Sequence, residues 1–160
     1  RGSAMTIRPK NAEAIAKINK SEYSAIIATN QPAIAKGFLS EKDLYNIHKK
    51  METLLGKKGV YVDEIYYCPH HPETGFKGEV KELKINCECR KPASGMLIQA
   101  AKDFNIDLDN SWMIGDSERD IIAGKNAGCK TIYINKEGGI NNYADFSTKD
   151  LFSAVKLIGV

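Results

Sequence analysis

The sequence predicts an α/β domain in which helices pack on a parallel sheet. Short β-branched apolar runs alternate with segments of helical periodicity, several of the runs end in polar turns, and there are no internal repeats. Such alternation produces right-handed βαβ units, which place helices on a parallel sheet. The length of 160 residues suits one domain.

Strands and helices are expected in regular alternation. Apolar residues recur at helical spacing in the helices, whereas the strands are short runs rich in apolar and β-branched residues. In chain order we expect a helix over 11–20, a strand over 24–28, a helix over 40–56, a strand over 60–67, a helix over 92–104, a strand over 112–114, a helix over 117–127, a strand over 131–134 and a helix over 151–158.

A capping serine, a glycine and a proline set three of the expected helix boundaries. Ser40 is an N-cap candidate with Asp43 in the acidic first turn, and Gly56 can end the long helix that follows. Pro92 suits the first turn of its helix. One face of that helix is predicted to be apolar through Met96, Leu97 and Ala100.

Composition excludes several classes of protein. A hydrophobic fraction of 42% and a charged fraction of 27% exclude disordered and fibrous chains. The longest apolar runs, such as residues 25–28, are far shorter than the roughly 18 residues of a membrane span. The net charge of +3 is too small to indicate nucleic acid or an anionic membrane. With no signal-peptide pattern we expect a cytoplasmic protein, in which residues 1–5 are a vector scar and residues 6–160 the domain.

Cysteines and histidines form a cluster with metal-ligand spacing. In a chain without a secretory signal this favours a metal over disulfides. The set predicts a closed tetrahedral zinc site of the structural kind, built by Cys68, His70, Cys87 and Cys89. His71 could replace His70, and the alternative is a chance gathering of free thiols. Metal binding would order residues 72–89, which have no clear period. Cys129 is interpreted as a small buried hydrophobe.

Polar turns end three of the expected strands, over residues 29–31, 68–70 and 115–116. Ligands of parallel α/β sheets bind beyond the carboxyl ends of the strands. We therefore expect these three turns to meet at one edge of the sheet and to form the functional site there.

Two acids at i and i+4, Asp116 and Asp120, lie where a strand passes into a helix. Gly115 allows a tight turn, and a carboxylate at the strand tip suits Mg²⁺ together with phosphate oxygens. The alternative is that Asp116 or Ser117 only caps the helix.

Two further polar segments are candidates for anion binding. Thr29 and Asn30 offer a hydroxyl, an amide and backbone N–H groups to a phosphoryl oxygen, although such a turn is also common for local reasons. Arg90 and Lys91 precede a helix, where a cation gains nothing from the helix dipole. They favour an anion, and the alternative is a solvated basic pair.

Together these motifs resemble the haloacid dehalogenase superfamily of phosphatases. Within it they resemble the zinc-containing, capless branch of heptose bisphosphate and histidinol-phosphate phosphatases. The likeness runs from about Ile7 to Asn135 and implies a three-layer Rossmann-like fold. The segments that carry it are Ala28-Thr29-Asn30-Gln31, Ile34-Ala35-Lys36-Gly37, Tyr66-Tyr67-Cys68-Pro69-His70-His71-Pro72, Cys87-Glu88-Cys89-Arg90-Lys91-Pro92, Gly95-Met96, Gly115-Asp116-Ser117 through Asp120, Ala123-Gly124 and Ala127-Gly128.

The resemblance implies a role for each matching residue. Thr29, Asn30 and Gln31 would bind the phosphoryl group, and Lys91 would neutralise its charge. Asp116 would hold Mg²⁺ with support from Asp120, while Lys36 and Arg90 would face the substrate. Structural zinc would be held by Cys68, His70, Cys87 and Cys89. Pro32 departs from the serine usual at its position.

The nucleophile is a larger departure from the family pattern. Family members use an Asp-x-Asp at the end of a first strand, where the first Asp forms an aspartyl-phosphate and the second is the general acid and base. Residues 1–28 contain no Asp, and Asp107-Leu108-Asp109 lies between a helix and a strand. Loss of that strand would remove the centre of the sheet at a large cost in stability. We therefore expect the natural protein to carry it, the alternative being a natural remnant.

The resemblance implies a Mg²⁺-dependent phosphatase acting on a small phosphorylated sugar. A heptose 1,7-bisphosphate losing its 7-phosphate is the expected reaction, a step towards the activated heptose of lipopolysaccharide, and histidinol phosphate is the alternative substrate. Two rival functions are an inactive phosphate- and zinc-binding domain and a zinc-stabilised interaction module. Nucleic acid and membrane partners are not expected, and a monomer is favoured.

Overall fold

The computed structural model describes residues 8–160, so the expected vector scar and Ile7 lie outside the described part. In chain order its elements are α1 (Pro9–Asn19), β1 (Ile26–Asn30), α2 (Pro32–Ala35), α3 (Glu41–Gly56), β2 (Glu64–Cys68), the 3₁₀ turn η1 (Lys81–Leu83), α4 (Gly95–Phe104), the 3₁₀ turn η2 (Leu108–Asn110), β3 (Trp112–Gly115), α5 (Glu118–Ala127), β4 (Lys130–Ile134), β5 (Phe146–Thr148) and α6 (Leu151–Ile158).

All strand pairs of the described chain are parallel, as the sequence predicts, but they form two sheets. One sheet pairs β1 with β2, and the other has the order β3-β4-β5. No ladder joins β1 to β3 within residues 8–160. The break lies between β1 and β3, and the parallel α/β class is confirmed.

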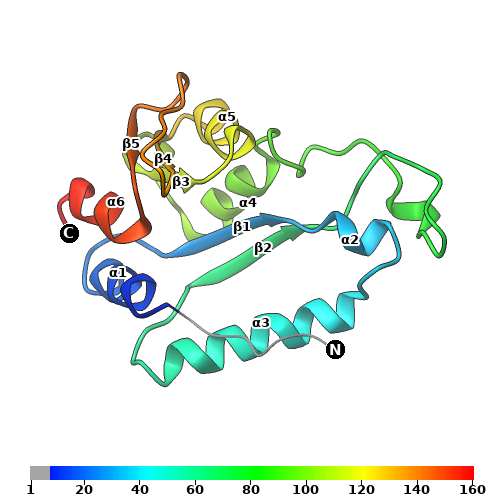
Figure 1. Ribbon diagram of the computed structural model, residues 1–160, viewed down its shortest axis with the longest axis horizontal. Helices are drawn as coiled ribbons and strands as arrows, with labels where there is room; N and C mark the ends of the chain where they lie inside the picture. Colours follow the sequence, from blue (N-terminus) through cyan, green and yellow to red (C-terminus); the bar gives the residue numbers. More distant parts are fainter. Residues whose placement is uncertain (1–7) are drawn as a thin grey trace.

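Helices cover both faces of the β1–β2 sheet (Figure 1). In that view α3 lies on one side of the two strands and α4 on the other, and α4 contacts both strands. In the second sheet, α5 packs on β3 and β4, while α6 contacts β4, β5 and the N-terminal helix α1. This arrangement gives the three layers implied by the resemblance.

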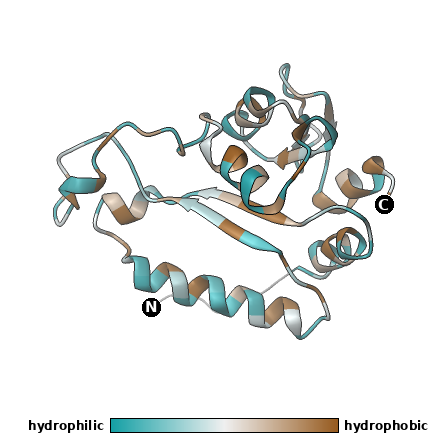
Figure 2. Ribbon diagram, turned by 180° about the vertical axis from the view of Figure 1, so that it is seen from behind, coloured by the Kyte–Doolittle hydropathy of each residue, from teal (hydrophilic) through white to brown (hydrophobic). Residues whose placement is uncertain are grey.

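Buried apolar residues hold these layers together. Leu55, Ile121, Ile132 and Val155 are almost completely buried. Met96, Leu97 and Ala100 are buried on α4, as predicted. The long helix α3 has mixed hydrophilic and hydrophobic segments (Figure 2), as suits a helix with one face on a sheet. Cys129 is only half-buried against the core.

The capping box predicted at the start of α3 is present. Ser40 Oγ accepts a hydrogen bond from the backbone N–H of Asp43 at 3.0 Å, and the Asp43 carboxylate accepts one from the backbone N–H of Ser40 at 3.2 Å. The helix ends at Gly56, as predicted.

Two boundaries differ from the predictions by more than two residues. The strand expected over 60–67 pairs only from Glu64, because Val60 packs against Leu55 as part of the apolar core. The helix expected to begin at Pro92 begins at Gly95 instead. Residues 90–93 form a turn closed by Ala93 N–H on the Arg90 carbonyl, and Gly95 N–H donates to the Glu88 carbonyl at 2.8 Å.

Within residues 8–160 no helix has both the length and the apolar character needed to cross a bilayer.

Candidate functional site

The end of β1 holds the loop that carries Lys91. Asn30 Nδ2 donates to the Lys91 carbonyl at 3.1 Å, and the Lys91 backbone N–H donates to Asn30 Oδ1 at 2.9 Å. The two bonds join residues that are 61 positions apart in the chain. The side-chain amide of Asn30 therefore positions the Lys91 loop, a use that the sequence does not reveal.

The Lys91 side chain links β1 to the start of α5. Its ammonium donates to Asp120 Oδ1 at 2.6 Å and to the Ala28 carbonyl at 2.8 Å. Lys91 and Asp120 are only 8% and 7% exposed, so both charges are buried. A buried ion pair of this kind holds its geometry because breaking it leaves an uncompensated charge. A solvated basic residue is therefore excluded for Lys91.

A tight turn after β3 brings Asp120 into this position. Ser117 caps α5 by accepting from Asp120 N–H, while Asp120 Oδ2 accepts from Ser117 N–H at 3.2 Å. A Cβ atom at position 115 would collide with the Asp120 carboxylate, which explains the glycine there. Ser117 is thus the cap, and the Asp116 carboxylate is exposed, with no hydrogen bond to any described residue.

Gln31 connects the ends of β1 and β2. Its backbone N–H donates to the Cys68 carbonyl at 2.8 Å, and its side-chain amide donates to Thr29 Oγ1 at 3.1 Å. Pro32 then opens the short helix α2, which was not expected from the sequence. The strand ends therefore meet as predicted, because Gln31 joins β1 to β2 and Lys91 joins β1 to the turn after β3.

The predicted metal ligands lie together. One donor atom from each of four side chains lies within 4.8 Å of the other three, the residues being Cys68, His70, Cys87 and Cys89. His70 Nδ1 lies 3.5 Å from Cys68 Sγ and 3.3 Å from Cys89 Sγ. His71 faces elsewhere, and its Nδ1 accepts a bond from Glu73 N–H. Between the two histidines, the geometry favours His70.

The chemistry of this cluster suits a metal cation. Burial raises the pKa of the Cys68 thiol above its ordinary value, and burial together with the bonds to Cys68 and Cys87 raises the pKa of the Cys89 thiol. Thiols with raised pKa values would otherwise keep their protons, whereas a bound cation stabilises the thiolates. Three thiolates with one imidazole form a tetrahedral set that fits Zn²⁺.

The segment between the two ligand pairs is irregular, and backbone bonds fasten it at several points. Val80 N–H donates to the Ala35 carbonyl at 2.8 Å, and His71 N–H donates to the Leu83 carbonyl at 3.1 Å. In Figure 1 the segment extends beyond the ends of β1 and β2, and η1 packs beside α2. The segment thus lies against the carboxyl end of β1.

Basic side chains surround the buried His71. Burial lowers the pKa of His71, and the positive charges of Lys36, Arg90 and Lys84 lower it further. The Lys36 and Lys84 ammonium groups lie 4.9 and 5.0 Å from the ring centroid of Phe76. The sequence analysis identified Lys36 and Arg90 but not Lys84. The one sign of Lys84 in the sequence is that it lies shortly before the second cysteine pair.

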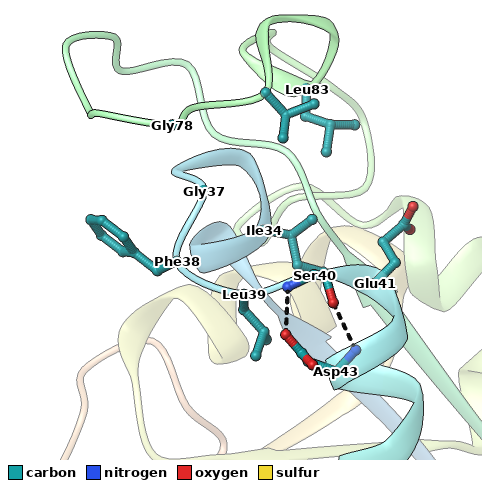
Figure 3. A pocket seen from close by; sticks show the side chains of 10 residues that line it. Ile34, Gly37, Phe38, Leu39, Ser40, Glu41, Asp43, Gly78 and Leu83 are labelled. Carbon is teal, nitrogen blue, oxygen red and sulfur yellow. Dashed lines mark hydrogen bonds between the residues drawn. The ribbon is translucent and has the colours of Figure 1, made fainter.

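A groove of about 490 Å³ lies beside this segment (Figure 3). It is lined by residues of the α2–α3 connection, including Phe38, and by Gly78, Val80 and Leu83 of the irregular segment. None of the residues expected to bind the phosphoryl group lines it. The groove is therefore distinct from the strand-end site.

Comparison with known proteins places this arrangement in a family. A HAD-hydrolase-like family model matches residues 88–148. A D-glycero-beta-D-manno-heptose-1,7-bisphosphate 7-phosphatase from Haemophilus influenzae is 40% identical over 147 residues, which are 87% of this chain and 77% of that protein. The chain belongs to this family of HAD-like phosphatases.

A second relative and two solved structures agree with this membership. The protein of the same name from Pasteurella multocida is 42% identical over 79% of this chain and 66% of its own length. A D,D-heptose 1,7-bisphosphate phosphatase from B. bronchiseptica, complexed with magnesium and phosphate, is 30% identical with a TM-score of 0.77, covering 94% of this chain and 82% of that one. A putative HAD-like phosphatase from Mesorhizobium loti is 29% identical with a TM-score of 0.81, covering 97% and 76%.

Proposed function

We propose that this protein is a Mg²⁺-dependent phosphatase that removes the 7-phosphate of D-glycero-D-manno-heptose 1,7-bisphosphate. The observation that carries the proposal is the buried Lys91 ammonium, fixed between Ala28 and Asp120 at the start of the helix that follows the exposed Asp116. The names of the relatives supply the substrate.

Residues at the strand ends would share the work of binding the transferring phosphoryl group. Lys91 would neutralise phosphate charge as a compact, fixed cation. Thr29 would present its hydroxyl and Gln31 its amide at the end of β1, while Asn30 would keep the Lys91 backbone in place. Preorganised donors of this kind stabilise developing charge without reorganising during the reaction.

The two metals would have separate roles. Asp116 would hold Mg²⁺, which when bound withdraws charge from phosphate oxygens. Asp120 would support this by fixing Lys91 and the turn that presents Asp116. The cluster of Cys68, His70, Cys87 and Cys89 would hold structural Zn²⁺ and order the adjacent irregular segment.

Turnover requires an attacking carboxylate in addition to these groups. The family reaction uses an aspartate at the end of a strand before Thr29, and residues 1–28 contain none. The groups described above also suit a second candidate function, a domain that binds Mg²⁺ and phosphate without hydrolysis. The proposed hydrolysis applies to the protein that supplies the aspartate.

One experiment separates the two candidates. Phosphate release from the heptose 1,7-bisphosphate and from histidinol phosphate would be measured in the presence of Mg²⁺. The binding of inorganic phosphate would be measured by calorimetry with and without Mg²⁺. Release from the heptose bisphosphate supports the phosphatase, and faster release from histidinol phosphate changes the substrate. Mg²⁺-dependent binding without release supports the binding domain. Binding should be lost in Asp116→Asn and kept in the matched control Glu118→Gln, and its absence in the parent chain contradicts both candidates.

A further inference from the structure

The three sulfur atoms of the predicted metal cluster lie close to one another. Cys89 Sγ is 2.8 Å from Cys68 Sγ and 3.4 Å from Cys87 Sγ, and Cys68 Sγ is 3.5 Å from Cys87 Sγ. All three are free thiols. A disulfide between two of them would use the same sulfur atoms that a metal needs as thiolates. Oxidation and metal binding therefore compete at this cluster.

The closest two sulfurs come from opposite ends of the irregular segment. Cys68 is the last residue of β2, whereas Cys89 lies 21 positions further along the chain and directly precedes Arg90. A covalent bond between them would close the same loop that the metal closes. A bond between Cys87 and Cys89 would not do so, because both belong to the same end of the segment.

The three thiols differ in their access to solvent. Cys68 is completely buried, while Cys87 and Cys89 are partly exposed. A small oxidant can thus reach Cys89 from solvent, and Cys68 is in contact with it from inside the protein. Cysteines that respond to oxidants combine an accessible sulfur with a second sulfur close by. Cys129 is also partly exposed, but it lies outside the cluster.

We propose that Cys68 and Cys89 are a redox-sensitive pair, which a peroxide converts into a disulfide with loss of the metal. This inference rests on the zinc site of the proposed function and adds a modification to it. A covalent clamp then replaces the metal clamp of the irregular segment. Lys91 keeps its bonds to Asn30 and Asp120, so the strand-end charges stay in place.

The reaction takes two steps. The Cys89 sulfur attacks one oxygen of hydrogen peroxide and the O–O bond breaks, which gives a sulfenic acid and one water. The Cys68 sulfur then attacks the Cys89 sulfur, and the S–S bond forms as the sulfenic oxygen leaves in a second water. The sulfurs lose two electrons to the peroxide, and the two thiol protons, supplied by solvent where the cysteines are thiolates, leave in the water. Only His70 and Cys87 then remain as ligands, too few for a structural zinc site.

Treatment of the Zn²⁺-loaded chain with excess hydrogen peroxide tests the proposal. Released zinc would be measured with a colorimetric chelator, cysteine pairing by peptide mass mapping, and local order by amide exchange. We expect stoichiometric release of zinc, a chain lighter by two hydrogen atoms, and a disulfide that joins Cys68 to Cys89. Exchange should increase over residues 72–86 and stay unchanged at the Lys91 amide. Dithiothreitol with Zn²⁺ should restore the original mass and zinc content.

Thermal melts distinguish a new clamp from simple loss of the metal. The oxidised chain should melt roughly 5–10 °C above the reduced chain from which zinc has been removed, because a disulfide across a loop of this length constrains the unfolded state. Equal melting temperatures of these two forms would contradict the covalent clamp.

The two neighbouring histidines provide a matched pair of variants. His70→Asn weakens metal binding but keeps all three thiols, so its disulfide should form at least about tenfold faster, because a bound cation occupies the sulfur electron pairs and protects them. His71→Asn should react at the rate of the parent chain, since His71 lies outside the cluster and its Nδ1 accepts from Glu73 N–H. Cys129→Ser should also react like the parent chain.

The outcomes separate this inference from the proposed function. A disulfide between Cys68 and Cys89 with release of zinc supports the redox pair whether or not a phosphorylated sugar is hydrolysed, and absent hydrolysis argues against the phosphatase alone. Addition of oxygen to the cysteines without this disulfide overturns the inference. A chain that keeps its zinc and its thiols in excess peroxide, or one that binds no zinc on reconstitution, overturns it as well.

Discussion

The strand-end site and the irregular segment beside it are held in different ways. At the strand ends, Lys91 makes three direct bonds to other elements through its backbone N–H and ammonium, and its ion pair with Asp120 is buried. The segment between His71 and Cys87 has only the short turn η1 and a few backbone bonds. A group of four candidate metal ligands at its two ends takes the place of a sheet ladder or an apolar core.

This difference indicates how the two regions can change independently. A site fixed by buried bonds keeps one geometry, which suits a reaction that needs charges at set positions. A segment fixed by a metal can vary in sequence between its ligands at little cost to the fold.

Removal of the metal should have the largest effect, and it should loosen the irregular segment while the strand-end site stays intact. Cys87→Ser should abolish stoichiometric zinc, lower Tm by roughly 5–10 °C, and increase amide exchange across residues 72–89 while β1 and β2 stay protected. Zinc analysis, thermal melts and hydrogen exchange measure these effects. Cys129→Ser is the control, since Cys129 lies outside the cluster. Unchanged zinc content in Cys87→Ser would sink the assignment.

The buried ion pair should show the next largest effect. Lys91→Met leaves the Asp120 carboxylate buried without its partner and should cost about 3–5 kcal/mol of unfolding free energy. Lys49→Met removes the exposed pair with Glu52 and should cost less than about 1 kcal/mol. Denaturant melts measure both values. Equal costs in the two variants would contradict the claim that burial makes Lys91 different.

Two asparagines allow a sharper comparison within the fold. Asn30 makes two bonds to the Lys91 backbone, and Asn19 makes two to the Tyr61 backbone at 2.9 and 3.0 Å. Asn30→Ala should cost about 2 kcal/mol and weaken Mg²⁺-dependent phosphate binding, because Lys91 is released. Asn19→Ala should cost less and leave that binding unchanged. Equal phosphate affinities in the two variants would show that Asn30 has no positioning role.

The smallest effects should come from the two helix caps. Ser40 and Ser117 form the same capping box, so alanine at either position should cost about 1 kcal/mol. Only Ser117→Ala should also lower phosphate affinity, since its box includes Asp120. Parallel denaturant melts and phosphate titrations of the two variants measure this difference, and a matching loss of affinity in Ser40→Ala would contradict it.

Local patterns in the sequence predicted most helices and the grouping of Cys68, His70, Cys87 and Cys89. The box at Ser40 and Asp43 needs only neighbouring residues, and the cysteine pairs are recognisable by their spacing. The bonds from the Asn30 side chain to the Lys91 backbone join residues 61 positions apart, so no local pattern in the sequence predicts them. The short strand β5 was missed because three residues carry too little periodicity.

The remaining misses have the same origin. Pro92 at a helix start is a sound local expectation, but the turn that brings Lys91 to β1 delays the helix to Gly95. Lys84 became visible as a candidate only when the structure showed its buried ammonium over Phe76.

The two bonds of the Lys91 ammonium also limit what else it can bind. A lysine ammonium carries three N–H donors. Two of them are used by the Ala28 carbonyl and by Asp120 Oδ1. One N–H donor therefore remains for a further acceptor, and its direction is set by the two bonds already made.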